Sequence, residues 1–249
     1  NDLSMLWTGV LNPGDSEAIE LAPTTVANSG PQELWVRSSI PGFPQEADPF
    51  NNNRVLRFDV RPEGSFPFLE QFEQNELFNG SWLVRNSDAA TTWDTLSTGG
   101  QEPGTHSVYM KMRQYYPIEG QKDDLISPFI DLPITQTSTL RFAICYSFVH
   151  TTFSDSLQVF VSQDCGESWE SIYKKGGEEL GLPDSITDGD SDFIPTQPEH
   201  WRTEDIQLTG FEGESILLRF QSTNDRGSNM ILDNIRVFSE ADPTMVSTD

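Results

Sequence analysis

The chain has 249 residues, with 39 Asp or Glu against 15 Lys or Arg, and its formal net charge is −24. A surface this acidic repels phosphate, so nucleic acid and anionic lipid are excluded as expected partners. Aromatic residues make up 11% of the chain, enough for a hydrophobic core, and no apolar run approaches the roughly 18 residues of a membrane-spanning helix. No signal peptide opens the sequence, so we expect a mature protein or an excised fragment.

Short strands separated by turns are the predicted elements along the whole chain. Alternating or apolar runs typical of strands occur at residues 33–37, 55–60, 140–144, 157–161 and 216–220. Gly, Pro, Asn and Asp lie between these runs, and no long segment has apolar residues at helical spacing. The pattern predicts an all-β protein built from β-sandwiches.

A polar stretch containing Pro and Gly at residues 61–65 (RPEGS) marks a domain boundary. Residues 1–62 have room for about four strands, fewer than a complete immunoglobulin-like sandwich of about 100 residues needs. We therefore expect them to form the C-terminal part of such a domain. Residues 66–239 are long enough for one complete sandwich, and the polar residues 240–249 are predicted to be a linker tail.

Residues 66–239 carry an ordered series of short motifs. They are FPFLEQFE at 66–73, GSW at 80–82, NSD at 86–88, TTW at 91–93, GQKDDLISP at 120–128, SDSL at 154–157, SQDCGESW at 162–169, HWRT at 200–203 and LDNI at 232–235. The series resembles the cleaved-adhesin or choice-of-anchor J domain of secreted Bacteroidetes proteins, which is related in fold to MAM domains and gingipain adhesin domains. This resemblance implies a jelly-roll β-sandwich.

The first segment resembles the end of an adhesive immunoglobulin-like domain of the CARDB-like kind. The matching stretches are LWTG at 6–9, LNPG at 11–14 and DPFNNN at 48–53. In such architectures a catalytic module, for example a pappalysin-like metallopeptidase, can precede these domains, and a sorting domain for type IX secretion usually follows. The resemblance thus implies neighbouring domains in a longer chain.

Calcium is the cofactor that the resemblance implies. Glu73 opens the first jelly-roll strand and Asp233 lies in the last, and in jelly-roll modules these two strands commonly lie close together. Asp124 and Asp88 are the expected third and fourth ligands, because Ca²⁺ takes several oxygen ligands. The alternative is that these carboxylates are solvated at strand ends or cap turns.

Residues 162–169 fit the Asp-box pattern S-x-D-x-G-x-x-W through Ser162, Asp164, Gly166 and Trp169. Asp can hydrogen-bond the backbone inside a turn, Gly supplies a positive φ, and Trp packs over the hairpin. Sialidases contain the motif at a position remote from their catalytic site. We therefore predict a structural role for it.

Two other features have both a binding and a structural interpretation. Trp93, Trp201, Tyr115 and Tyr116 are candidates for an exposed platform that stacks against a sugar, whereas a sandwich core also needs large aromatic residues. Residues 224–229 (NDRGSN) either form a ligand or ion loop or simply connect two strands of a hairpin.

Catalytic patterns are not found in the sequence. His106, His150 and His200 lie far apart and outside any HExxH pattern, and Cys145 and Cys165 are expected to be unpaired and mostly buried. We therefore predict a non-catalytic, secreted or cell-surface module that binds an extracellular protein or glycan without membrane insertion. The alternatives are accessory domains of a secreted metallopeptidase or other hydrolase, a glycosidase with two converging carboxylates, and a structural spacer of a surface fibre.

Overall fold

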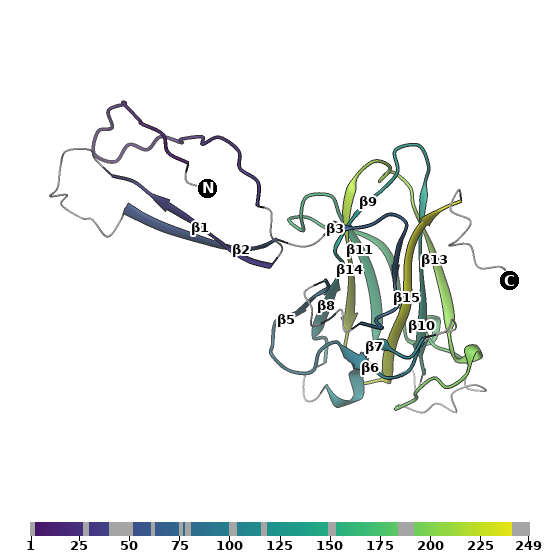
Figure 1. Ribbon diagram of the computed structural model, residues 1–249. Helices are drawn as coiled ribbons and strands as arrows, with labels where there is room; N and C mark the ends of the chain where they lie inside the picture. Colours follow the sequence, from purple (N-terminus) through teal and green to yellow (C-terminus); the bar gives the residue numbers. More distant parts are fainter. Residues whose placement is uncertain are drawn as a thin grey trace. The chain divides into compact units, whose positions relative to one another are not determined.

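The computed structural model describes residues 3–26, 30–39, 52–60, 63–74, 77, 81–99, 104–115, 119–148, 153–183 and 192–240. The chain divides into two compact units, Asn1–Val60 and Arg61–Asp249. Strands are the main regular elements of both units (Figure 1), so the prediction of an all-β protein is confirmed. Within these ranges, no helix has the length and apolar character needed to cross a membrane.

The described part of the first unit contains one two-stranded antiparallel sheet. Strand β1 (Gly30–Arg37) pairs with β2 (Asn53–Val60), and Leu34 lies opposite Leu56. The described residues of this unit thus form two strands, whereas the sequence predicted about four strands within residues 1–62.

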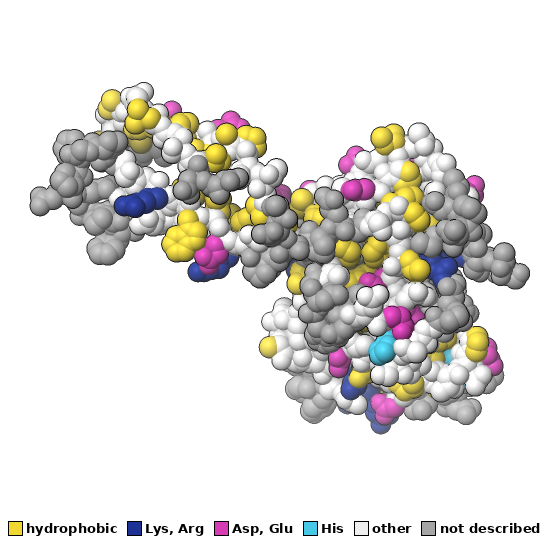
Figure 2. Space-filling model, viewed as in Figure 1, with side chains coloured by type: hydrophobic (Ala, Val, Ile, Leu, Met, Phe, Trp, Pro, Cys, Tyr) yellow, Lys and Arg dark blue, Asp and Glu magenta, His cyan; other side chains and the backbone are white. Residues whose placement is uncertain are grey.

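The sheet of the first unit exposes apolar side chains on both faces. One face carries the 2.7 Å ion pair between Arg57 and Glu33 together with the exposed ring of Trp35. The opposite face carries Leu34, Leu56 and Phe58, each more than a third exposed. Figure 2 shows hydrophobic side chains at the surface of this unit. The described residues of the unit thus lack a closed core.

The second unit is a sandwich of two sheets (Figure 1). One has six strands in the order β13-β10-β15-β7-β6, with β4 also paired to β15; the other has seven in the order β12-β11-β14-β8-β5, extended by β9 and β3. Only the β3–β9 pair is parallel among the described strands. The bounds are β3 (Glu63–Gly64), β4 (Phe68–Glu70), β5 (Leu83–Asn86), β6 (Asp94–Leu96), β7 (Ser107–Lys111), β8 (Lys122–Ile126), β9 (Phe129–Asp131), β10 (Ser138–Tyr146), β11 (Ser156–Ser162), β12 (Glu170–Gly176), β13 (Arg202–Leu208), β14 (Ser215–Thr223) and β15 (Asn229–Ser239), with short 3-10 helices η2 (Met112–Gln114), η3 (Gly177–Glu179) and η4 (Pro198–His200).

The main core lies between the two sheets and is rich in aromatic rings. Phe142 on β10 meets Phe220 on β14 edge to face, with ring centres 5.4 Å apart. Trp82 packs against Phe220 at 6.2 Å, and its indole N–H donates a hydrogen bond of 2.8 Å to the buried carboxylate of Glu70. The polar end of this large side chain is therefore satisfied inside the core.

A second, smaller apolar cluster covers the outer face of the six-stranded sheet. It includes Trp201, Cys145 and Ile231, with Phe193 packed against it. Strand β15 is buried along its whole length; it contributes Met230, Leu232, Ile235 and Val237 to the main core and Ile231 to the second cluster. Both cysteines are free, but only Cys145 is buried; Cys165 is exposed in a turn, contrary to the expectation of burial.

Candidate functional site

Glu73 follows β4 and fixes a neighbouring segment. Its carboxylate accepts hydrogen bonds from the Thr105 N–H at 2.6 Å, the Thr105 hydroxyl at 2.7 Å and the His106 N–H at 2.8 Å. Burial opposes ionisation, but these hydrogen bonds outweigh it and lower the pKa of Glu73 to about 2. Both carboxylate oxygens are thus engaged in holding the chain just before β7.

Asp233 and Asp124 lie in different sheets and have separate partners. Asp233 is buried on β15 and accepts the N–H of Asn234 at 2.7 Å, at a bulge where Asn234 has a φ of 50°. Asp124 on β8 accepts the side-chain amide of Gln221 at 2.8 Å. In the described ranges no three Asp, Glu, His or Cys side chains come together in a way that could hold a metal ion. The four predicted calcium ligands are therefore not assembled into one site. They are Glu73, Asp88, Asp124 and Asp233.

A different pair of carboxylates does converge, where β5 pairs with β8 at the edge of the seven-stranded sheet. Asp123 is completely buried, and Asp88 follows β5. The Tyr115 hydroxyl lies 2.8 Å from an oxygen of Asp88 and 2.8 Å from an oxygen of Asp123. Burial raises the pKa of Asp123, and the charges of Asp88 and Asp124 add to this rise, whereas hydrogen bonds from Tyr115 and Thr92 oppose it.

Sequence reasoning selected Asp124 and missed its neighbour Asp123. The alternation of β8 contained the missing signal, because Asp123 and Leu125 share the buried face and Asp124 faces the other way. A glycosidase would also use two nearby carboxylates. No sugar can reach between Asp88 and Asp123, however, because Asp123 has no exposed surface.

The aromatic residues predicted to form a stacking platform lie in the interior. Trp93 and Tyr115 are each 2% exposed in the main core, and Trp201 is 5% exposed in the second cluster. The indole N–H of Trp93 donates to the backbone oxygen of Asp123 at 3.2 Å. Tyr116 lies outside the described residues. The rings of Trp93, Trp201 and Tyr115 are therefore core components and offer no face to a sugar.

The Asp-box residues form a self-contained turn between β11 and β12. The Ser162 hydroxyl donates to Asp164 at 2.7 Å, Asp164 accepts the Ser168 N–H at 2.9 Å, and the Trp169 indole donates to the Gly166 carbonyl at 3.0 Å. Gly166 has a φ of 89°, a conformation that favours glycine. The hydrogen bonds from Ser168 and Ser162 lower the pKa of Asp164 to about 2. Each of these contacts stabilises the turn itself.

The outer face of the seven-stranded sheet carries an arginine held between two aromatic rings. The guanidinium carbon of Arg219 lies 4.1 Å from the ring centre of Phe160 and 4.4 Å from that of Trp169. Its ion pair with Asp124 is long, 3.9 Å from Nη1, and its Nε has no hydrogen-bond partner among the described residues. We call Arg219, Phe160, Trp169 and Asp124 the Arg219 platform.

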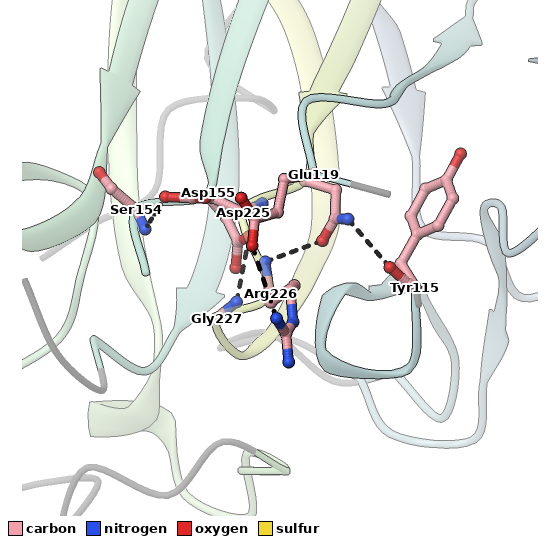
Figure 3. A network of polar contacts seen from close by, with 8 residues as sticks. Tyr115, Glu119, Ser154, Asp155, Asp225, Arg226 and Gly227 are labelled. Atoms are coloured by element: carbon pink, nitrogen blue, oxygen red, sulfur yellow. Dashed lines mark hydrogen bonds and ion pairs between the residues drawn. The ribbon is translucent and has the colours of Figure 1, made fainter. Parts of the chain in front are cut away.

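Figure 3 shows a second polar network, in the turn between β14 and β15. The fully buried carboxylate of Asp155 accepts the N–H groups of Asp225, Gly227 and Ser228 and the hydroxyl of Tyr146, at 2.5–3.2 Å. Burial raises the pKa of Asp155 to about 6, although these hydrogen bonds favour the ionised form. Asp155 therefore anchors the turn to the rest of the fold.

The charged side chains of the same turn have partners within the fold (Figure 3). Asp225 accepts the Ser154 N–H at 2.7 Å, and Arg226 lies 3.5 Å from Glu119. The side-chain amide of Asn224 donates to the backbone oxygen of Tyr115 at 3.1 Å. These contacts favour the interpretation of residues 224–229 as a hairpin connection over that of a ligand loop.

No protein-family model matches the sequence, and no curated protein matches it. Among solved structures, the chain is similar to the K1 cleaved adhesin domain of Lys-gingipain from Porphyromonas gingivalis W83, with 16% identity and a TM-score of 0.50 over 70% of this chain and 98% of that one. It is also similar to the K3 cleaved adhesin domain of the same protein, with 16% identity and a TM-score of 0.45 over 69% and 98% of the two chains. A third similar structure is TmCBM61 in complex with β-1,4-galactotriose, with 15% identity and a TM-score of 0.41 over 68% and 99%.

The likeness to the K1 domain concerns the fold. At 16% identity it shows that the chain shares a β-sandwich fold with that domain, and it shows nothing finer than the fold. The expected jelly-roll sandwich is thus confirmed as a fold class, while the finer assignments to MAM-like and CARDB-like domains stay predictions. Any function must be argued from the residues of this chain.

Proposed function

We propose that the chain is a non-catalytic binding module of a secreted or cell-surface protein, and that its Arg219 platform contacts a glycan. The observation that supports this proposal is a guanidinium held between two partly exposed rings, with 15% of the Arg219 side chain itself exposed. Sugar hydroxyl groups accept hydrogen bonds from the exposed N–H groups of a guanidinium. The C–H faces of a sugar ring pack against aromatic side chains, which combine an apolar body with a defined geometry.

The surroundings of the platform suit a neutral glycan. Gln221 lies beside Asp124 on the same sheet face, and on the neighbouring strands the Gln158 amide donates to the Ser171 hydroxyl at 2.8 Å. Amide and hydroxyl groups can exchange hydrogen bonds with sugar hydroxyls. A polyanionic glycan is a poor candidate, because the chain has a net charge of −24.

The proposal includes an extracellular location and no catalytic role. The similarity of fold to a cleaved adhesin domain supports an adhesion or targeting role within a longer chain. The carboxylate pair that shares Tyr115, Asp88 and Asp123, is closed to substrate because Asp123 is completely buried, which disfavours a glycosidase site at this pair. Calcium binding, which the resemblance implies, stays a prediction.

Binding of the full chain to a panel of neutral oligosaccharides, measured by isothermal titration calorimetry, tests the platform. Arg219→Gln and Trp169→Ala should each weaken binding by about 1–3 kcal/mol, the usual loss for removing a central hydrogen-bonding or aromatic contact. Arg57→Gln and Trp35→Ala, which change exposed residues of the first unit, are the matched controls. The proposal fails if no neutral glycan binds, and a spacer or protein-binding role then gains support.

A further inference from the structure

The first unit carries most of the exposed apolar side chains of the described chain. Thirteen of the fifteen large hydrophobic side chains that are exposed there belong to this unit, and only Leu69 and Ile134 belong to the second. Single exposed apolar residues are ordinary on a protein surface, whereas a group of them marks an interaction site. Such a group lies on the two paired strands of the unit and consists of Leu34, Trp35, Val36, Leu56 and Phe58.

The two strands also leave the edges of their sheet open. In the described chain β1 and β2 pair only with each other (Figure 1). An open edge presents backbone N–H and C=O groups to which a strand of another chain can be added. Pro31 lies in β1 and has no N–H, which weakens pairing along that edge. Strand β2 contains no proline, so it is the edge that can pair along its whole length.

The charge of these strands allows two copies of the chain to meet there. The whole chain has a net charge of −24, and copies with this charge repel each other. Strands β1 and β2 are an exception, because they contain three Arg against one Glu and one Asp, a net charge of +1. Arg54 has no ion pair in the described part of the chain, and it lies on the same face of β2 as Leu56 and Phe58.

We propose that β2 pairs with β2 of a second copy of this chain, antiparallel about a two-fold axis at Leu56, and so forms a four-stranded sheet. A two-fold axis perpendicular to the sheet places one residue of β2 opposite its own copy. With Leu56 at the axis, Leu34, Leu56 and their two copies form one apolar row across the four strands, because Leu34 already lies opposite Leu56. Arg54 then lies opposite Phe58 of the second copy, where its guanidinium can contact the ring.

The charges and the length of β2 select this register over its neighbours. An axis at Arg57 would place two guanidinium groups directly opposite each other, which is destabilising. An axis at Val55 or at Phe58 would leave only residues 53–57 or 56–60 of the strand paired. The axis at Leu56 pairs residues 53–59 of each copy and brings Arg57 opposite Val55, so no like charges meet.

The contact is small, so the pairing is weak. It joins one strand from each copy and lies at the low end of the interface sizes known for transient complexes, so we expect a dissociation constant of about 0.1–1 mM. The chain is therefore monomeric at micromolar concentrations and pairs where many copies are held close together. The inference is independent of glycan binding, because the Arg219 platform belongs to the second unit.

Disulfide trapping of the full chain tests the register. The background is Cys165→Ser, which removes the exposed free thiol. In the proposed sheet the two copies of residue 56 have Cα atoms about 4.5–5.5 Å apart, within the disulfide range. Leu56→Cys should therefore form disulfide-linked dimers with oxidised glutathione, at a rate that rises with protein concentration. Leu34→Cys is the matched control: it is exposed on the same face, but its copies lie three strand spacings apart, about 14 Å, and it should link at least about tenfold more slowly.

Sedimentation equilibrium of the full chain provides a second readout that needs no cross-link. At physiological ionic strength the wild type should be a monomer at about 10 μM and at least half dimeric at about 1 mM. Leu56→Lys should stay monomeric at both concentrations, because two ammonium groups would lie opposite each other at the axis. Ile134→Lys makes the same kind of change at an exposed residue of the second unit and should dimerise like the wild type.

Three outcomes would overturn the proposal. The first is a monomeric wild type at about 1 mM with equally slow cross-linking of both cysteine variants, which would mean that something other than a second copy covers these strands. The second is faster cross-linking of Leu34→Cys than of Leu56→Cys, which would make β1 the pairing edge. The third is dimerisation of Leu56→Lys as strong as that of the wild type, which would place the contact elsewhere on the chain.

Discussion

Neighbouring carboxylates in this protein have different chemistry because their surroundings differ at the scale of single residues. Glu73 receives three hydrogen bonds near the surface, and its pKa falls to about 2. Asp155 also receives several hydrogen bonds, yet burial dominates and its pKa rises to about 6. Asp123 and Asp124 are adjacent in sequence, but only Asp123 is enclosed in the core. Residue type therefore indicates which groups can ionise, and burial together with hydrogen bonding decides whether the charged or the neutral form of each carboxyl group is favoured.

The raised pKa of Asp155 predicts a stability that decreases with rising pH. The folded protein holds this proton more tightly than the unfolded chain, whose pKa is near 3.8. The contribution of Asp155 to stability is therefore fully present below about pH 3.8 and is lost as pH rises through about 6. A shift of this size corresponds to roughly 3 kcal/mol at most.

Urea unfolding between about pH 5 and 7, above the isoelectric point of about 4.2, would measure this effect. The difference in unfolding free energy between wild type and Asp155→Asn should shrink as pH rises, because the amide does not titrate. Asp131→Asn, an exposed change elsewhere, should show no such trend. A wild-type to Asp155→Asn difference that is constant or grows with pH would contradict the prediction.

At the scale of elements, the sequence pattern predicts strands well and their partners poorly. The runs at 140–144, 157–161 and 216–220 fall inside β10, β11 and β14. Each run shows local apolar spacing, which does not depend on the rest of the fold. The convergence of Asp88, Tyr115 and Asp123 depends instead on pairing between β5 and β8, segments about forty residues apart. No local pattern contains that information, which is why the sequence prediction included Asp88 but grouped it with carboxylates other than Asp123.

The packing of β10 against β14 predicts a large effect for Phe220→Ala. Phe220 is fully buried, meets Phe142 of the other sheet and packs against Trp82. Its truncation should lower the unfolding free energy by about 3–5 kcal/mol, because both transfer and cavity terms are lost. Phe58→Ala removes the same ring from a more exposed position in the first unit and should change it by less than about 0.5 kcal/mol. Comparable losses for the two variants in urea unfolding would argue against this assignment of the core.

At the scale of the whole molecule, the acidic charge and the apolar surface are distributed differently. On the face seen in Figure 2, acidic side chains of the second unit are scattered among other polar groups, which agrees with a role in solubility. The second unit has a closed core between two sheets, whereas Leu34, Leu56 and Phe58 of the first unit remain exposed. Composition could not predict this contrast, since both segments contain enough apolar residues for strands.

The contrast predicts that only the second unit folds independently. A fragment of residues 61–249 retains both sheets and the buried aromatic cluster, so its melting temperature should lie within a few degrees of that of the full chain. A fragment of residues 1–60 has one two-stranded sheet, and an isolated hairpin is at best marginally stable in water, so it should show no cooperative transition. Circular dichroism and calorimetry on the two fragments would measure this. A sharp transition in residues 1–60, or a fall of more than about 10 °C for residues 61–249, would mean that the two units depend on contacts absent from their separate cores.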